Sequence, residues 1–391
     1  MRSPQVFFFI LPMFFVLTLT YLTFRLKKWS AWGGRKSKLL MGAMVFFLAG
    51  IFGGFYLLRS PPEQFREWSW AYHGAFIILG TVISLLIYTI ALDLLFLPKN
   101  ILTKIKKKPH ADNINLDRRK FIGIGAATAG SVAVGYWQGS GDPNINHQII
   151  RLPNLPKEFV GFKIAQISDL HIGTMIGPDY IESVIRATNA IGADIIALTG
   201  DIADGSLSSI KNDVQLLKAL KAKEGVLYIT GNHEYFWGVE DWLQVFKENG
   251  ARTLLNEHIV LTRETSKLVI AGVTDFESAK RHPTHVSDPK AALLGAPEGV
   301  PKILLAHQPK SYKAAQEAGF DLQLSGHTHG GQFFPWSIFV ALAHPYYRGL
   351  NKFENMWIYT STGTGFWGPP LRFSVPKEIA LIELRSDSED S

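Results

Sequence analysis

The stretch Gly326-His327-Thr328-His329-Gly330-Gly331 is the most informative part of this chain. Two imidazoles placed two residues apart and enclosed by glycines are unusual in a hydrophobic core, and they suit metal binding. Similar side chains recur upstream, in Asp169-Leu170-His171, Gly200-Asp201, Gly231-Asn232-His233-Glu234 and His307. Alone, Asp169-Leu170-His171 would usually be a polar loop, Gly231–Glu234 could be a turn and His307 a surface histidine, whereas the stretch Gly326–Gly331 is more specific. Their combination and order predict a site for two cations.

The motif stretches follow predicted strands. From about residue 160, short apolar runs alternate with amphipathic segments, a pattern typical of a layered α/β domain. The predicted strands are Lys163–Ser168, Ile195–Thr199, Gly225–Thr230, Leu268–Val273, Lys302–Ala306, Asp321–Ser325, Met356–Tyr359 and Glu378–Leu384. The predicted helices are Pro178–Ala190, Lys211–Ala222, Val239–Glu248 and Lys310–Ala318. Because ligands bind beyond the carboxyl ends of strands in open α/β sheets, we expect the motif side chains to meet there.

The donor types restrict the metal. The chain has no cysteine, which excludes disulfides, thiolate metal sites and cysteine nucleophiles. Carboxylates with imidazoles suit Mn, Fe or Zn better than a calcium cage. One carboxylate can bridge two ions about 3.5–4 Å apart, and such a pair supplies a metal-bound hydroxide and neutralises charge on a phosphoryl group. We therefore expect two divalent metal ions and a phosphoester substrate.

Taken together, these stretches resemble the calcineurin-like metallophosphoesterase superfamily over about residues 160–391. The resemblance implies an α/β fold with a sandwich of two mixed β-sheets flanked by helices. It implies that Asp201 bridges two ions, one held by Asp169, His171, Asp201 and His329 and the other by Asp201, Asn232, His307 and His327. It also implies that His233 contacts phosphate and is a candidate general acid.

Departures from the family pattern point to a subfamily. Ser/Thr protein phosphatases carry Gly-Asp-x-x-Asp-Arg-Gly, whereas Asp204-Gly205-Ser206 here lacks the arginine. The segments Gly326–Gln332 and Ser361–Arg372 resemble bacterial membrane-associated phosphoesterases. That group includes enzymes acting on the pyrophosphate of UDP-2,3-diacylglucosamine. By its charge, Arg372 is a candidate phosphate contact; the alternative is a surface arginine.

Aromatic residues lie close in sequence to the histidine motif. They form the run Phe333–Val340 and the pair Phe366-Trp367. An apolar lip beside a hydrolytic site would suit a lipid-linked substrate or bring the site to the bilayer. The alternative is that these residues fill the core of the sandwich.

The first 150 residues differ from the rest in charge and hydropathy. They carry 17 Lys/Arg against 6 Asp/Glu, whereas residues 151–391 carry 23 against 27. The positive net charge of +7 therefore comes from the apolar first part of the chain. Apolar runs at about 5–24, 39–58 and 75–97 approach the roughly 20 residues that cross a bilayer as a helix. A weaker run covers 121–137. We expect a transmembrane region over 1–137, a linker over 138–157 and the metallophosphoesterase domain over 158–391.

The orientation follows from loop charge. Six Lys/Arg occupy 25–38 and eight occupy 98–120, whereas Arg59 and Arg66 are balanced by Glu63 and Glu67, so the first and third loops are expected in the cytoplasm. If 121–137 is a fourth span, the domain lies outside the cytoplasm. The stretch Asp117–Ile122 resembles a twin-arginine export signal, so a cleaved signal is the competing interpretation. Without the fourth span the domain remains cytoplasmic.

These observations predict a multi-pass, membrane-anchored phosphoesterase that hydrolyses a phosphodiester or pyrophosphate bond, with its domain outside the cytoplasm. One alternative is a lipid pyrophosphatase at the cytoplasmic face. Another is a non-catalytic membrane scaffold that kept the fold. The soluble part has no Lys/Arg stripe with interleaved aromatics, so no nucleic-acid partner is expected.

Overall fold

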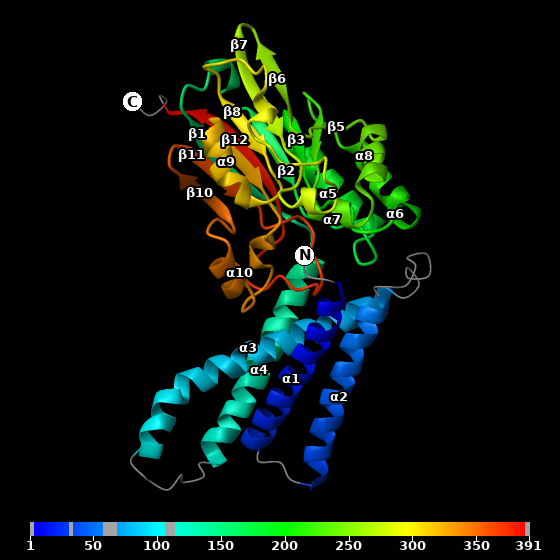
Figure 1. Cartoon of the computed structure of the whole chain (residues 1–391), viewed down its shortest axis with the longest axis vertical. Helices are drawn as coiled ribbons and strands as arrows, with labels where there is room; N and C mark the ends of the chain where they lie inside the picture. The colour runs from blue at the N-terminus through cyan, green and yellow to red at the C-terminus, as the bar shows by residue number, and fades with distance from the viewer. Residues whose placement is uncertain (1–3, 31–33, 58–68, 106–113, 388–391) are drawn as a thin grey trace.

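The computed structural model describes residues 4–30, 34–57, 69–105 and 114–387 (Figure 1). A β-sandwich with flanking helices forms the upper part of the molecule in this view, and four long helices form the lower part. The expected sandwich of two mixed sheets is confirmed.

Both sheets have six strands. The first has the order β1-β12-β2-β3-β4-β5, with parallel pairing from β2 to β5 and β12 antiparallel to β2. Its strands are β1 Asn144–Leu152, β12 Glu378–Ser386, β2 Lys163–Ile167, β3 Ile195–Thr199, β4 Val226–Ile229 and β5 Arg252–Thr253. The second has the order β10-β11-β9-β8-β7-β6, parallel from β7 to β11 and antiparallel at both edges. Its strands are β10 Gly349–Phe353, β11 Met356–Thr360, β9 Leu322–Ser325, β8 Lys302–Leu305, β7 Ser266–Gly272 and β6 Glu257–Arg263.

Alternation along the strands builds one core between the sheets and one on each outer face. Ile164 and Ile229 of the first sheet meet Ile270 and Leu305 of the second, all fully buried. Outside the first sheet pack α5 Pro178–Ile191, α6 Leu207–Val214 and α8 Val239–Glu248. Outside the second sheet packs α9 Tyr312–Ala318. The short helices α7 Asn232–Phe236 and α10 Ser337–Ala343 lie in loops.

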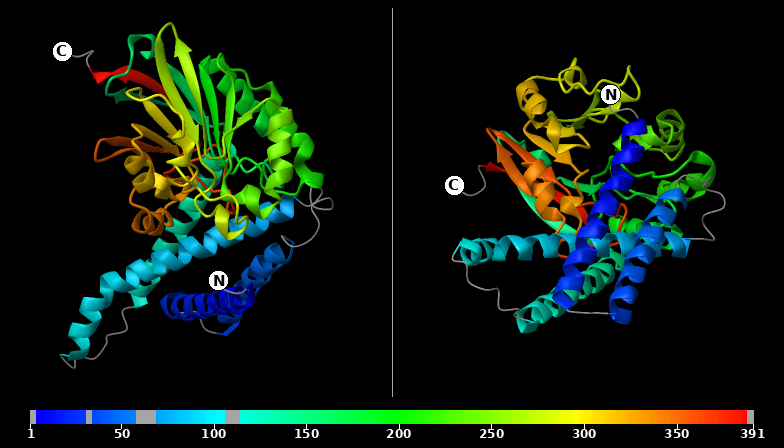
Figure 2. Two further views of the ribbon diagram at one scale, coloured as in Figure 1. Left: turned by 45° about the horizontal axis from the view of Figure 1, so that its top comes forward. Right: turned by 60° about the horizontal axis from the view of Figure 1, so that its bottom comes forward.

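The helical region consists of α1 Pro4–Ser30, α2 Gly34–Leu57, α3 Ser69–Ile105 and α4 Ile114–Ser140. Figures 1 and 2 show α3 passing beneath the sandwich and α4 running into it, with α1 and α2 farther away. Among the described residues, Ser69–Leu97 is the one helical segment long and apolar enough to cross a membrane, judged by length and composition. The expectation of four spans stays a prediction.

The contact between the two regions is close. The backbone N–H of Arg372 donates to the carbonyl of Gly135 on α4 at 2.8 Å. The buried ammonium of Lys377 donates to the carbonyl of Gly139 at 2.7 Å. A Cβ added at Gly80 of α3 would lie 2.5 Å from Cδ1 of Leu371. The segment 366–373 is thus packed directly against α3 and α4.

The structure corrects the expected linker. Within residues 138–157, α4 continues to Ser140 and β1 begins at Asn144, so the connection between them is three residues long. Strand β1 pairs with β12 over its whole length, and Ile150 and Leu152 are fully buried. Gly139, Gly141 and Pro143 precede the strand, and Pro153 and Pro156 follow it.

Candidate metal centre

The predicted ligands lie at one end of both sheets. Each follows a strand: Asp169 and His171 follow β2, Asp201 follows β3, Asn232 follows β4, His307 follows β8, and His327 and His329 follow β9. Asn232 and His327 are half-buried, and the other five are buried. The structure therefore brings all seven sequence-predicted ligand residues to one buried edge.

The backbone at these residues is unusual. Five of the seven have φ between 50° and 69°, in the left-handed region, namely Asp169, His171, Asp201, His327 and His329. Non-glycine residues adopt this conformation at a cost of about 1–3 kcal/mol, and such residues cluster at functional sites. Neighbouring glycines permit the close approach, because a Cβ at Gly326 would lie 2.2 Å from Oδ2 of Asp169.

Asp169, His171 and His329 form the first group of ligand atoms. Nε2 of His329 lies 3.1 Å from Nε2 of His171 and 3.6 Å from Oδ1 of Asp169. Asp169 is held from behind by the backbone N–H of His327 and the hydroxyl of Ser168. Burial lowers the pKa of His329 well below its usual range, and the guanidinium of Arg372 adds to this shift. A neutral imidazole is the form that binds a metal.

Asp201, His307 and His327 form the second group. Nε2 of His307 lies 3.2 Å from Oδ2 of Asp201, and its Nδ1 is 2.9 Å from the carbonyl oxygen of Thr199. This backbone contact orients the ring so that Nε2 faces Asp201. Burial lowers the pKa of His327 to about 3 and keeps it neutral.

Two observations show that these residues fit a pair of cations. Oδ1 of Asn232 is buried and has no hydrogen-bond partner among the described residues, although buried amide oxygens normally have one. Oδ2 of Asp201 lies between the groups, 3.9 Å from Nε2 of His171 on one side and 3.2 Å from Nε2 of His307 on the other. The donors are carboxylate, imidazole and amide groups, which suit divalent metal ions.

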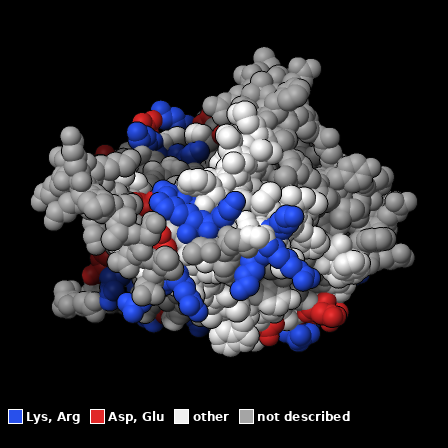
Figure 3. Space-filling model, turned by 90° about the horizontal axis from the view of Figure 1, so that it is seen from below, with Lys and Arg blue, Asp and Glu red and all other residues white. Residues whose placement is uncertain are grey.

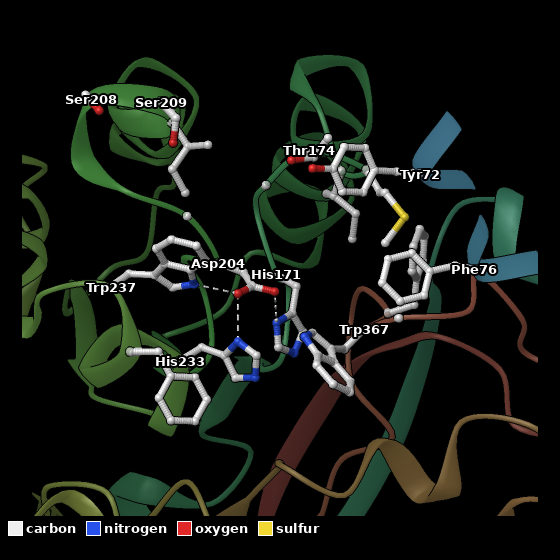
Figure 4. A pocket seen from close by; sticks show the side chains of 18 of the residues that line it. Tyr72, Phe76, His171, Thr174, Asp204, Ser208, Ser209, His233, Trp237 and Trp367 are labelled. Atoms are coloured by element: carbon white, nitrogen blue, oxygen red, sulfur yellow. Dashed lines mark hydrogen bonds and ion pairs between the residues drawn. The ribbon is translucent and has the colours of Figure 1, made fainter. Parts of the chain in front are cut away.

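His233 lies beside the two groups and is oriented by Asp204 (Figure 4). Nδ1 of His233 is 2.7 Å from Oδ1 of Asp204, and the indole N–H of Trp237 donates to the same oxygen at 2.9 Å. Oδ2 of Asp204 lies 3.3 Å from Nδ1 of His171. Burial alone would lower the pKa of His233, but Asp204 and Asp201 outweigh it and raise this pKa to about 9.

Sequence reasoning missed the roles of Asp204 and Glu234. The buried carboxylate of Glu234 accepts the backbone N–H groups of Asp201, Ile202, Ala203 and Gly231 at 2.7–3.1 Å. It thereby joins the loop after β3 to the start of α7. The available signals were the acidic side chains of Asp204 and Glu234 within the motif stretches themselves.

The structure gives Arg372 a role different from the predicted phosphate contact. Its side chain is fully buried, and its Nη1 donates to the carbonyls of Thr362 at 2.6 Å and His329 at 3.2 Å. Nη2 contacts the carbonyl of Gly365 and lies 3.0 Å from Nδ1 of His329. The guanidinium therefore positions His329, and the predicted phosphate contact stays a prediction. Charge alone could not distinguish a buried arginine from an exposed one.

Comparison with known proteins identifies relatives of the chain. The profile of the calcineurin-like phosphoesterase family matches residues 162–331. A Helicobacter pylori protein described as an uncharacterized metallophosphoesterase is 37% identical over 265 residues, covering 67% of this chain and 70% of the relative. A Danio rerio transmembrane protein with a metallophosphoesterase domain is 29% identical over 354 residues, covering 88% of this chain and 79% of that protein.

A solved structure of the NAD nucleotidase of Haemophilus influenzae aligns with a TM-score of 0.38 and 16% identity, covering 52% of this chain and 46% of that one. The family profile covers the part of the chain that holds the candidate ligands. The chain therefore belongs to the calcineurin-like metallophosphoesterases and is a metal-dependent phosphoester hydrolase.

Proposed function

We propose that this protein is a membrane-anchored phosphoesterase that uses two divalent metal ions to hydrolyse a phosphodiester or pyrophosphate bond. The observation that carries the proposal is the central position of Asp201 between two groups of ligand atoms. The first ion would be held by Asp169, His171, Asp201 and His329. The second would be held by Asp201, Asn232, His307 and His327. Mn, Fe or Zn would satisfy this donor set.

Bound metal ions would lower the pKa of water and neutralise charge on the phosphoryl group. The protein's own contribution is positioning and proton transfer. Nε2 of His233 lies 3.9 Å from Oδ2 of Asp201, so it can face a phosphoryl group held at the shared carboxylate. The raised pKa keeps His233 protonated at neutral pH, the form that donates a proton to a leaving oxygen. Asp204 holds its ring in place.

We propose that the helical region anchors the domain outside the cytoplasm. Figure 3 looks at the helix ends farthest from the sandwich and shows Lys and Arg side chains gathered there. Exposed basic residues at these ends are Lys27, Lys28, Arg35, Lys36, Lys38, Arg118 and Arg119. Positive ends face the cytoplasm, so the sandwich at the other end would lie outside. Lys106, Lys107, Lys108 and the balanced second loop lie outside the described residues.

A reporter fused after Asp142 tests the orientation. Alkaline phosphatase, active only outside the cytoplasm, should be active there, and a fluorescent protein that folds only in the cytoplasm should be dark. The reverse pattern would support the cytoplasmic-face pyrophosphatase instead.

Asp93, the acidic residue near the end of the third apolar run, pairs with Arg25 at 2.6 Å and so lies at the same basic end of the helices.

The exposed aromatic lip supports a lipid-linked substrate. Trp336 is 43% exposed and α10 has no buried residue, so the run from Trp336 onward does not fill the core, whereas Phe333 and Phe366 are buried. The ring of the neighbouring Phe334 contacts Tyr88 of α3, with 6.3 Å between centroids. Trp336→Ala should impair hydrolysis of an acylated substrate more than that of a small chromogenic diester. Equal loss on both substrates would count against the lip.

Metal analysis coupled to hydrolysis tests the function itself. The full-length protein in detergent should hold two equivalents of metal and hydrolyse bis(p-nitrophenyl) phosphate. Asp201→Asn should lose metal and lower the rate by more than about 100-fold, because even partners behind metal ligands cost 10–100-fold. The exposed Asp179→Asn is the matched control. An Asp201→Asn variant that retains full activity would overturn the assignment, and a protein that binds metal but hydrolyses no ester would indicate a scaffold.

A further inference from the structure

A cavity of about 550 Å³ lies between the metal centre and α3 (Figure 4). His171, Asp204 and His233 line it on the side of the metal centre, and Tyr72 and Phe76 line it from α3. Its volume falls within the roughly 300–1,000 Å³ typical of ligand sites. The helical region therefore forms part of the surface next to the reacting centre.

This part of α3 is fixed against the domain. A Cβ added at Gly368 would lie 3.6 Å from the ring of Phe76, and one added at Gly80 would lie 3.1 Å from Cβ of Pro369. Tyr72 is only 3% exposed. Because the helix and the segment 366–373 touch along this length, α3 closes the cavity on this side.

The cavity has an apolar end and a hydroxyl-bearing end. Tyr72 and Phe76 line it from α3, with Trp367 and the hydroxyl of Thr174 on the same side (Figure 4), and Met175, Ile176 and Phe366 are further apolar lining residues. At the opposite end it is lined by Ser208 and Ser209 of α6 and by Asn212. Figure 4 shows the two serines and Tyr72 on opposite sides of the pair His171 and His233. A phosphorus atom held at these histidines would therefore have an apolar surface on one side and neutral polar groups on the other.

The charges of the residues that line the cavity further restrict the class of ligand. Among the described residues that line the cavity there is no lysine or arginine, and its one carboxylate, Asp204, is engaged by His233 and Trp237. A nucleotide or other polyanionic group would find no Lys or Arg side chain on these surfaces in addition to the His233 that faces the reacting phosphoryl group, although recognition of additional phosphates normally uses Arg or Lys. Neutral hydroxyl groups would be matched by the serines and the asparagine.

We propose, resting on the proposed function, that the substrate is a phosphodiester joining an apolar chain to an uncharged, hydroxyl-bearing group, as in a phospholipid with a polyol head group. The apolar chain lies against Tyr72 and Phe76 and continues along α3, which is itself long and apolar enough to cross a membrane. The polyol lies at Ser208 and Ser209. The membrane helix is thus a specificity element of the active site.

The reaction is a hydrolysis. The oxygen of water forms a bond to phosphorus, and the phosphorus–oxygen bond to the polyol breaks. His233 lies with Trp237 toward the serine end of the cavity (Figure 4), so the polyol oxygen leaves with the proton of His233. His233 regains a proton from the attacking water. The products are a free polyol and a lipid phosphomonoester.

The test compares three diesters with the full-length protein in detergent micelles and Mn²⁺. Dioleoyl phosphatidylglycerol contains both arms, glycerophosphoglycerol lacks the apolar chains, and bis(p-nitrophenyl) phosphate reports hydrolysis alone. Because burial of the acyl chains against the apolar end is favourable, kcat/KM for phosphatidylglycerol should exceed that for glycerophosphoglycerol by at least about tenfold. Glycerol and phosphatidic acid should be the products. Phosphatidylserine, with a charged head group, should be a poorer substrate.

Variants on both sides of the cavity test whether its apolar residues cause the preference for phosphatidylglycerol. Phe76→Ala on α3 and Met175→Ala on the domain should each lower the ratio of phosphatidylglycerol to bis(p-nitrophenyl) phosphate hydrolysis by about tenfold. Phe96→Ala, on α3 but outside the cavity, where its ring contacts Lys120, should leave the ratio unchanged. Equal kcat/KM for the two glycerol diesters, or a fall with Phe96→Ala as large as with Phe76→Ala, would overturn the inference. Failure to hydrolyse bis(p-nitrophenyl) phosphate as well would instead overturn the proposed function.

Discussion

The helical region exposes apolar side chains, whereas the metal-ligating edge of the sandwich buries ionisable ones. On the helices, Phe24, Leu39, Val45 and Phe46 are each 65–67% exposed. At the metal-ligating edge, Asp169, Asp201 and His307 are 0–2% exposed. In water, exposed apolar groups and buried ionisable groups are both unfavourable. Each therefore needs surroundings that stabilise it, such as lipid for the apolar groups or hydrogen-bond partners for the ionisable ones.

The partners differ between the two regions. Lipid would compensate the exposed apolar residues, which supports the proposal of a membrane anchor. The buried polar groups are compensated by each other and by backbone N–H groups, as Glu234 shows with its four donors. Substitutions at the metal-ligating edge should therefore lower stability or activity because hydrogen bonds are lost. Substitutions at the junction with the helices should lower stability because packing is disturbed.

Arg372→Met should give the largest loss of stability. It removes the donor to the carbonyls of His329, Thr362 and Gly365, and each buried carbonyl left without a partner costs about 1–3 kcal/mol. We expect a loss of roughly 3 kcal/mol in the free energy of unfolding, measured by denaturation in detergent. Arg348→Met, whose guanidinium stacks on Tyr347, is the control and should stay within about 0.5 kcal/mol. If both variants had the same free energy of unfolding, the buried contacts of Arg372 would not contribute to stability.

Asp204→Asn should lower kcat by about 10–100-fold while leaving metal content unchanged. The carboxylate orients His233 and His171 but is not among the proposed ligands. Rates on bis(p-nitrophenyl) phosphate and metal analysis provide the two readouts. Asp241→Asn, an exposed aspartate at the start of α8, should change neither. Loss of metal together with activity would mean that Asp204 acts as a ligand.

Gly139→Ala tests the junction. The added Cβ would lie 2.4 Å from the carbonyl oxygen of Pro370, so the helix and the segment 366–373 must move apart at a cost of about 1–3 kcal/mol. Gly130→Ala, on the same helix with nothing within 4 Å of its added Cβ, should be neutral or stabilising. Thermal unfolding of both variants measures the difference. Equal melting temperatures would show that the two regions are not tightly packed.

Lys377 should make the stability of the protein depend on pH. Burial lowers its pKa to about 7, and Arg372 adds repulsion. Between pH 7 and about 10 the unfolded chain binds a proton that the folded chain does not, so stability rises with pH by at most about 1.4 kcal/mol per unit. Lys377→Met should flatten this rise in denaturation curves recorded at several pH values. An unchanged slope would contradict a neutral buried lysine.

The sequence was sufficient for the strands that carry ligands, because their apolar runs are buried and their ends coincide with His, Asp and Gly. It did not predict β6 or β10, which are edge strands without a buried residue. The role of Asp204 depends on partners 29 to 33 residues away, and Arg372 is buried through contacts with loops that only the fold brings together. Hydrogen bonds between residues that are far apart in the chain produce no local pattern in the sequence from which they could be predicted.

The continuity of α4 with β1 has a practical consequence for anyone preparing a soluble version of the enzyme. Cutting after residue 157 would delete a strand that pairs with β12 over nine residues and would leave the sites of Ile150 and Leu152 empty. The bare side of β12 would then be an open template for aggregation. A truncation that begins near Asp142 keeps the strand and is the better choice for expression.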